Sequence, residues 1–344
     1  GGFHEGKKTS DSLKNFDKVY TVVDNKLQEY NGVPEKLRPV VDLLTQEGYE
    51  FVDNLSGIGG QNIFSVKKGN ETFVVYYSTK NSANNIFLES AKDSINEGPI
   101  DLSGVFTNAV TAYTYSTAGV MWASAGGCFG AVGDNTTLVE NCDNKGKVTV
   151  DGKMPPTAAS SSSFGGVIGV SMAEVKYCDN LATEQTSLSG MSKNCHLGGC
   201  LGCAYKPVSN CKVSAPLKMA FDVTTLTTNQ ASAISNIGGI VGYTYSGASV
   251  SDCEVNSESL TATSNGELRF GGIVGMSYVK VSGCTNNAVM DVKRSPIIEG
   301  LKYVSYCGGV VGYQFENFAV EGSANKSKLS VTLDADSQYS RHHL

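Results

Sequence analysis

The sequence predicts a mainly β protein: a right-handed parallel β-helix-like solenoid preceded by a small N-terminal α+β domain. The composition is the first reason, because 39 glycines, only 8 prolines and 17% charged residues among 344 suit short strands joined by tight turns. The second is a Gly-Gly-apolar-apolar-Gly signature that occurs six times after residue 125. The third is the richness of these segments in Val, Ser and Thr, which favours strands over helices. Short β units of regular period bury their apolar faces by stacking on one another.

Residues 1–98 form a different kind of sequence, which we interpret as the α+β domain. Apolar side chains three and four residues apart predict a first helix, at Leu13, Phe16, Tyr20, Val23, Leu27 and Tyr30. A second helix is expected to begin near Pro39 and to end before Gly48. Three strands with two turns should follow, at Tyr49–Asn54, Asn62–Val66 and Thr72–Ser78, with turns at Gly57–Gly60 and Lys68–Asn70. The domain would end near Gly98-Pro99, and residues 99–125, with Trp122, would form a degenerate first coil or a cap.

The repeats occupy residues 126–344 as six coils and a C-terminal end segment. Their first glycines are spaced by 39, 33, 40, 33 and 37 residues, at Gly126, Gly165, Gly198, Gly238, Gly271 and Gly308. A second landmark follows each first glycine by 13 to 16 residues, at Cys142, Cys178, Cys211, Cys253, Cys284 and Ser323. Another strand-like stretch comes next, as in Lys147–Val150, Ser259–Thr263 and Leu329–Leu333. Each unit is therefore expected to hold two or three short strands.

These repeats resemble the GLUG motif, a glycine-rich repeat of bacterial secreted and surface proteins. The resemblance is carried best by Gly238–Val255, "GGIVGYTYSGASVSDCEV", and by Asn141–Gly152, "NCDNKGKVTVDG". It covers roughly Gly126 to Leu333 and none of the N-terminal region. The resemblance implies a parallel β-helix-like stack in an exported, adhesin-like protein, and it implies no catalytic residue. The sixth unit departs from the pattern by lacking the cysteine, and the third has additional cysteines.

Strand alternation sorts the side chains after each double glycine onto two faces. Counted from the first glycine as zero, the large face carries position three (Phe129, Ile168, Leu201, Val241, Val274, Val311), position five (Ala131, Val170, Cys203, Tyr243, Met276, Tyr313) and position seven (Gly133, Met172, Tyr205, Tyr245, Tyr278, Phe315). The other face is nearly bare glycine. We favour an inward large face, with the bare face covered by the opposite wall or the N-terminal domain. If the aromatic column is instead exposed, Tyr205, Tyr245 and Tyr278 are the candidate binding residues, for stacking on sugar rings.

The ten cysteines are interpreted as buried free thiols. Equivalent positions in adjacent coils lie ~4.8 Å apart with parallel side chains, a poor arrangement for a disulfide. Cys195, Cys200 and Cys203, beside His196 and before Cys211, match the spacing of a plant-type [2Fe–2S] loop or a zinc site. The repeat pattern already accounts for Cys200, Cys203 and Cys211, so we expect no metal and no cofactor.

Catalytic arrangements find little support. Three of the four histidines lie near the ends of the chain, at His4, His342 and His343, which argues against a Ser-His-Asp or Cys-His mechanism. Carboxylate pairs for a polysaccharide lyase or glycosidase are Asp252 with Glu254, Glu140 with Asp143, and Glu316 with Glu321. The asparagines beside the cysteine landmark are expected to form turn ladders, at Asn141, Asn144, Asn180, Asn210 and Asn286.

The charge of −6 argues against a nucleic-acid or anionic-membrane binder, and no apolar run approaches the roughly 20 residues of a membrane span. The chain opens on Gly-Gly rather than Met, so a removed signal peptide or lipid anchor would not be visible. We expect an exported, non-enzymatic binding or adhesion module, at the cell surface or secreted, whose partners are glycans or host or cell-surface proteins. The alternatives are a carbohydrate-active β-helix enzyme that uses surface carboxylates, and a structural stalk of a longer surface protein.

Overall fold

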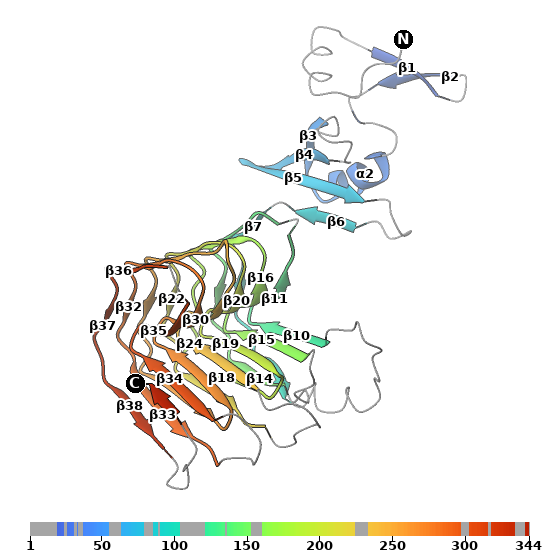
Figure 1. The fold of residues 1–344 in the computed structure, drawn as a ribbon. Helices are drawn as coiled ribbons and strands as arrows, with labels where there is room; N and C mark the ends of the chain where they lie inside the picture. The colour runs from blue at the N-terminus through green and yellow to red at the C-terminus, as the bar shows by residue number, and fades with distance from the viewer. Residues whose placement is uncertain are drawn as a thin grey trace. The chain divides into compact units, whose positions relative to one another are not determined.

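The structure is a computed structural model that describes residues 19–23, 26–30, 33, 37–54, 63–78, 85–88, 90–103, 121–134, 136–152, 160–223, 233–296, 303–315, 318–333 and 341–343. It divides into two compact units. One comprises residues 1–91 with 135–137, and the other comprises residues 92–134 with 138–344. Figure 1 shows the strands of both. In the described part of the chain, no helix is long and apolar enough to cross a membrane.

The N-terminal unit contains a β-hairpin where the sequence predicts the first helix. Strands β1 (Val19–Val23) and β2 (Lys26–Tyr30) pair antiparallel. The helix expectation is therefore wrong for this stretch. Three of the five residues of β1 are valines and another is Thr21, and such β-branched side chains lose rotamer freedom in a helix. Two residues, Asp24-Asn25, separate the strands, a connection length typical of hairpins.

The rest of this unit contains the predicted helix and the three predicted strands, together with a fourth strand that was not predicted. Helix α2 (Arg38–Gln46) carries Pro39 in its first turn, and it precedes an antiparallel sheet. The sheet is ordered β3 (Glu50–Asn54), β4 (Ile63–Lys68), β5 (Glu71–Ser78), β6 (Asn85–Leu88). The turn at Lys68–Asn70 is confirmed, with Gly69 at φ 60°, whereas Gly57–Gly60 lies outside the described residues. Val40 and Val41 of the helix, and Leu37 just before it, pack with Phe64 and Val75 of the sheet into one core.

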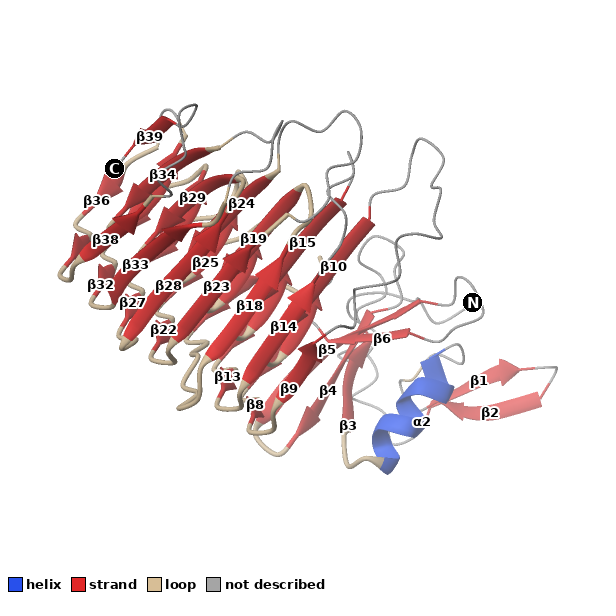
Figure 2. Cartoon of the chain, turned by 90° about the horizontal axis from the view of Figure 1, so that it is seen from below, coloured by secondary structure: helices blue, strands red, loops and turns tan. Residues whose placement is uncertain are grey.

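The second unit is a stack of coils in which every strand pair is parallel, as the predicted fold class requires (Figures 1 and 2). The strands before each double glycine form the entry sheet: β10 (Met121–Gly126), β15 (Ser160–Gly165), β19 (Asn194–Gly198), β24 (Ile234–Gly238), β29 (Glu267–Gly271), β34 (Val304–Gly308) and β39 (Arg341–His343). The strands after it form the exit sheet: β11 (Phe129–Val132), β16 (Ile168–Ser171), β20 (Leu201–Ala204), β25 (Val241–Thr244), β30 (Val274–Ser277) and β35 (Val311–Gln314).

Three further sheets complete each coil. The turn sheet contains β7 (Ser90–Lys92), β12 (Leu138–Glu140), β17 (Glu174–Lys176), β21 (Val208–Ser209), β26 (Val250–Ser251), β31 (Val281–Ser282) and β36 (Val320–Glu321). The asparagine sheet contains β8 (Ile95–Asn96), β13 (Asp143–Asn144), the bridge residue Asn180, β22 (Lys212–Val213), β27 (Glu254–Val255), β32 (Thr285–Asn286) and β37 (Ala324–Asn325). The closing sheet contains β9 (Ile100–Ser103), β14 (Val148–Gly152), β18 (Thr186–Gly190), β23 (Leu217–Phe221), β28 (Ser259–Ser264), β33 (Val289–Arg294) and β38 (Leu329–Thr332).

Two expectations about this unit need correction. A complete coil contains a strand of each of these five sheets, rather than two or three strands. The solenoid also starts earlier than expected, because β7, β8 and β9 lie within residues 90–103 and pair with the next coil. The boundary between the units therefore falls at Ala91 and Lys92 instead of near Gly98-Pro99. Residues 104–120 of the expected first coil lie outside the described residues, and Trp122 belongs to the entry sheet.

The core of the solenoid is built from columns of equivalent residues. The position just before each double glycine is fully buried in the inner coils, at Phe164, Leu197, Ile237 and Phe270. Position three is equally buried, at Ile168, Leu201, Val241 and Val274. Because each column continues through neighbouring coils, the stack buries apolar surface that a single coil would leave in water.

Candidate functional site

The bare glycine face of the exit sheet is covered by the backbone of the entry sheet. A Cβ added to Gly202 would overlap the backbone nitrogen of Phe164, and one added to Gly275 would overlap that of Ile237. Glycine is required at this column because the two sheets approach too closely for any side chain. The expectation that this face must be covered is thus correct, and the cover is the entry strand of the preceding coil.

Beyond this close contact, position seven of successive coils forms a tyrosine row along the solenoid. The row consists of Tyr205, Tyr245, Tyr278 and Phe315, each just beyond a strand of the exit sheet. The three tyrosines are partly exposed, and Phe315 is 44% exposed. The predicted large face is therefore divided: position three is buried, whereas position seven reaches the surface. The three candidate binding residues of the sequence prediction lie side by side on this surface.

The rings of the tyrosine row stack on one another. Tyr205 and Tyr245 have centroids 4.0 Å apart and planes only 14° apart, and Tyr278 lies 4.6 Å from Phe315. Between them, Tyr243 contacts Tyr245 at 4.8 Å and Tyr278 at 5.7 Å. The stack of Tyr205 on Tyr245 covers one face of each of these two rings, whereas the other contacts are tilted or edge-on. Burial raises the pKa of Tyr205, Tyr243 and Tyr245, so their hydroxyls stay protonated at neutral pH.

The inner border of the tyrosine row is polar and buried, a feature that the sequence reasoning missed. His196 on β19 stacks on Tyr243 at 4.6 Å, and its Nδ1 accepts a hydrogen bond of 3.0 Å from Nδ2 of Asn236. Burial, and then the nearby Arg269, lower the pKa of His196 to about 3. Arg269 donates to Oε1 of Glu267 at 2.8 Å and lies 5.0 Å from the Tyr313 ring centre. This border forms where side chains of the entry sheet meet side chains of the exit sheet. Alternation along a single strand cannot predict such a contact, because it says nothing about which strands face each other.

The apparent iron–sulfur spacing does not gather its ligands. Cys195 lies in the core beside Gly190, whereas Sγ of Cys200 donates to the carbonyl of Cys178 in another column. Burial raises the pKa of Cys195 to about 12 and that of Cys200 to about 11, which keeps both as neutral thiols. No three His, Cys, Asp or Glu side chains in the described ranges could hold a metal ion together.

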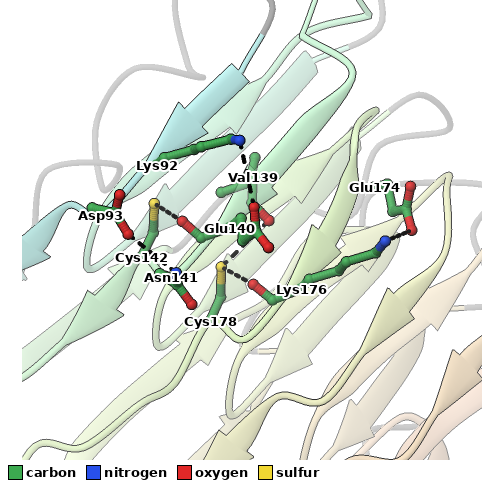
Figure 3. A network of polar contacts seen from close by, with 9 residues as sticks. All are labelled: Lys92, Asp93, Val139, Glu140, Asn141, Cys142, Glu174, Lys176 and Cys178. Carbon is green, nitrogen blue, oxygen red and sulfur yellow. Dashed lines mark hydrogen bonds and ion pairs between the residues drawn. The ribbon is translucent and has the colours of Figure 1, made fainter. Parts of the chain in front are cut away.

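The cysteine column stands beside the turn sheet, and all ten cysteines of the chain are unbridged. The column's Sγ atoms donate to the backbone carbonyl two residues earlier: Cys142 to Glu140 at 3.4 Å and Cys178 to Lys176 at 3.3 Å (Figure 3). The hydrogen bond with Cys142, and then burial, raises the pKa of Cys178, whereas the same hydrogen bond lowers the pKa of Cys142 to about 7. The thiols therefore act as buried turn caps.

One residue before this column, the backbone takes a left-handed turn in every coil. The turn residues have φ between 51° and 64°: Asp93, Asn141, Tyr177, Asn210, Asp252, Gly283 and Gly322. Asn, Asp and Gly tolerate this conformation best, which explains most of the column. Asn141 and Asn210 belong to this turn column, and Nδ2 of Asn141 donates to Oδ1 of Asp93 in the neighbouring coil at 3.1 Å, as expected of a turn ladder. Asp93 extends the column into the coil that the sequence reasoning missed.

A buried asparagine ladder crosses the asparagine sheet. Nδ2 of Asn144 donates to Oδ1 of Asn180 at 3.1 Å, and Nδ2 of Asn286 donates to Oδ1 of Asn325 at 2.8 Å. Val213 and Val255 take the equivalent positions between these segments. The predicted ladder is thus confirmed for Asn144, Asn180 and Asn286, and buried amides that satisfy one another hold neighbouring coils in register.

The candidate carboxylates have ordinary structural partners. Glu140 lies 3.6 Å from Nζ of Lys92, and Glu254 accepts from Nδ2 of Asn287 at 3.2 Å. Oδ1 of Asp143 accepts the backbone N–H of Asp179 at 3.0 Å. Glu321 pairs with Lys280 at 2.7 Å, and Glu316 lies outside the described residues. Asp252, the other described member of these pairs, is one of the left-handed turn residues, with φ 54°.

No family model, no curated protein and no solved structure matches this chain.

Proposed function

We propose that the chain is a non-enzymatic binding module whose contact surface is the tyrosine row. The observation that carries the proposal is the partial exposure of Tyr205, Tyr245 and Tyr278 in one line along the solenoid. Aromatic side chains with a polar tip supply contact area at low entropic cost, and tyrosine is enriched in binding surfaces.

The partner that best suits this row is an extended glycan lying along the solenoid axis. Adjacent coils repeat every ~4.8 Å, so the row presents a series of tyrosines from three successive coils along the solenoid axis. A polymer of short repeating units with many hydroxyls matches such a series. Ring edges and hydroxyls supply contacts in addition to the face-on sugar stacking of the sequence-based hypothesis, because Tyr205 and Tyr245 each cover one face of the other.

We further propose that the module works outside the cell or at its surface, as the likeness of its repeats to the GLUG motif implies. Free cysteines are uncommon in such oxidising surroundings. Here nine of the ten are buried, and only Cys128 is partly exposed. Burial restricts access of oxidants to the thiols, which reconciles unbridged cysteines with an exported protein.

Glycan-array binding followed by calorimetry tests the proposal. The double substitution Tyr205→Ala and Tyr245→Ala should weaken binding at least about tenfold while the protein stays folded, because these rings are partly exposed. The matched control is Tyr177→Asn, which removes a 49% exposed tyrosine from the turn column and suits its φ of 51°.

Three results would contradict the proposal. The first is no glycan binding, and the second is equal binding by the double variant and the wild type. The third is shortening of a bound polysaccharide that disappears when one acid pair is neutralised, as in Asp252→Asn with Glu254→Gln. That result would establish the polysaccharide-cleaving alternative.

A further inference from the structure

The two ends of the solenoid have unfinished sheets of matching shape. At one end, the turn, asparagine and closing sheets begin with β7, β8 and β9, one coil before the entry sheet begins with β10. At the other end, the entry sheet continues to β39, one strand beyond β36, β37 and β38 (Figure 2). For these four sheets, the described step at one end is therefore the complement of the step at the other, whereas the exit sheet runs from β11 to β35 and has no described strand at this level.

The strands at the second end present unpaired edges and exposed apolar side chains. β36, β37 and β38 are the last strands of their sheets in the described part of the chain. Leu329 and Val331 on β38 are partly exposed, whereas their partners Met290 and Val292 on β33 are buried. Unpaired edges of this kind can be extended by another strand.

The first coil carries side chains that fit this edge. Ile100 and Leu102 on β9 belong to the same two columns and are also partly exposed. Because each column is buried wherever it has neighbours on both sides, Ile100 stacked on Leu329 and Leu102 stacked on Val331 would complete both columns.

The asparagine ladder ends with a donor at one end and an acceptor at the other. Inside the stack, Nδ2 of Asn144 donates both to Gly146 in its own turn and to Asn180 in the next coil. Nδ2 of Asn325 donates only to the carbonyl of Ser327 among the described residues. Nδ2 of Asn96 donates to Gly98 and to Asn144, and its Oδ1 has no donor within the described ranges.

Charges at the two ends are complementary in the same columns. Lys92 precedes the turn residue Asp93, and Glu321 precedes the turn residue Gly322, so these opposite charges occupy equivalent positions. Glu97 follows Asn96 and Lys326 follows Asn325, again with opposite charges and again exposed. Stacking the first coil on the last coil therefore brings together two pairs of opposite sign.

We propose that a second copy of this chain docks head to tail on the last coil. In this complex β36, β37 and β38 pair with β7, β8 and β9 of the next copy, and β39 lies beside its β10. The composite coil takes its entry strand from one copy and its turn, asparagine and closing strands from the other. The two surfaces are different, so the contact is heterologous and continues into an open filament.

Charge reversal tests this proposal on the full chain by sedimentation velocity over a range of protein concentrations. Wild type should associate in a concentration-dependent manner and form filaments visible by electron microscopy. Lys326→Glu and Glu97→Lys should each weaken association about fivefold to tenfold at low ionic strength, because an attractive pair becomes a repulsive one. The matched controls are Lys218→Glu and Glu258→Lys, exposed residues of inner coils, which should leave association unchanged.

Mixing distinguishes head-to-tail stacking from other contacts. The Lys326→Glu chain has a reversed last coil and the Glu97→Lys chain a reversed first coil. Both contacts between unlike chains are then attractive, so the mixture should form filaments in which the two chains alternate. A chain with both substitutions should regain wild-type association. A wild type that sediments as one monomeric species at all concentrations would overturn the proposal. Association of unchanged strength in both single variants would also overturn the proposal. So would a mixture of the two variants that associates no more strongly than either variant alone.

Discussion

The inner coils and the last coil have the same pattern of residues, yet their side chains are buried to very different degrees. Val274 at position three of an inner coil is fully buried, whereas Val311 at the same position of the last described coil is partly exposed. Val281 is fully buried and its partner Val320 is 44% exposed. A coil therefore does not bury its own apolar face; its neighbours do.

The chemistry of the columns changes along with burial. The cysteine column ends in a serine at both ends, at Ser94 and Ser323, and each hydroxyl donates to the carbonyl two residues earlier, as the thiols do. A hydroxyl that reaches water loses little on folding, whereas a thiol tolerates complete burial. The same hydrogen bond is thus donated by a thiol in the buried inner coils and by a hydroxyl in the water-exposed end coils.

Substitution of the glycine at position four should give the largest difference in lost stability between inner and outer coils. Gly275→Ala would drive its Cβ into the backbone at Ile237 and Asn236, and we expect it to destabilise the protein by at least ~3 kcal/mol. Gly130→Ala is the matched control in the first coil with an exit strand, because its Cβ would meet only the carbonyl of Ser124 at 3.4 Å. Urea denaturation of both variants measures the difference. Similar losses in the two would contradict this account of the close contact.

The closing sheet allows the same comparison with an apolar side chain. Leu260→Ala removes a fully buried side chain, with an expected loss of ~2–5 kcal/mol in the free energy of unfolding. Leu329→Ala in the same column should cost only ~1 kcal/mol, because this side chain is already partly exposed. The measurement belongs at protein concentrations where the chain is monomeric. Equal losses would mean that the last coil is covered in solution.

The burial of His196 in an inner coil should make the free energy of unfolding depend on pH. Its folded pKa of about 3 lies below the unfolded value of ~6.5, so only the unfolded chain takes up a proton at this site between these values. Stability contributed by the neutral ring is therefore complete above pH ~6.5 and is lost as pH falls towards 3. From pH 7 to pH 5 we expect a loss of ~2 kcal/mol.

His196→Gln is the control, since it should remove this part of the pH dependence while it keeps a polar group near Asn236. Urea denaturation gives the free energy of unfolding of each protein at pH 7 and at pH 5. The difference between the two proteins in this pH-dependent change is the contribution of His196. A wild type and a variant with the same slope would show that His196 is not held neutral in the folded protein.

The sequence was sufficient for the repeat and its β character, but it underestimated the number of strands per coil and missed features set by contacts across sheets. The double glycines predict coils because they recur at a regular spacing. The hairpin at Val19–Tyr30 was missed because Leu27 and Tyr30 continue a helical spacing that began at Leu13. The coil at residues 90–103 was missed because it lacks the double glycine and has Ser94 where later coils have cysteine.

The candidate site was predicted in its members and missed in its geometry. Tyr205, Tyr245 and Tyr278 share a column, so their alignment follows from the repeat alone. Their partial exposure does not, because it depends on where the entry sheet stops covering the exit sheet. His196 beside Tyr243 was equally invisible, since the two belong to different strands and different coils.

The smallest expected effect tests whether cysteine and serine are placed by burial. Cys253→Ser keeps a donor for the carbonyl of Ser251, 3.2 Å away, but places a hydroxyl where only 1% of the residue is exposed. We expect a loss of ~1–2 kcal/mol from desolvation of the hydroxyl. Ser323→Cys in the last coil should change stability by less than ~0.5 kcal/mol, because that position already contacts water. If both exchanges cost the same, the column would be ordered by thiol chemistry instead of burial. Matched denaturation curves under reducing conditions distinguish the two cases, and only a burial-driven column makes the inner exchange the costlier one.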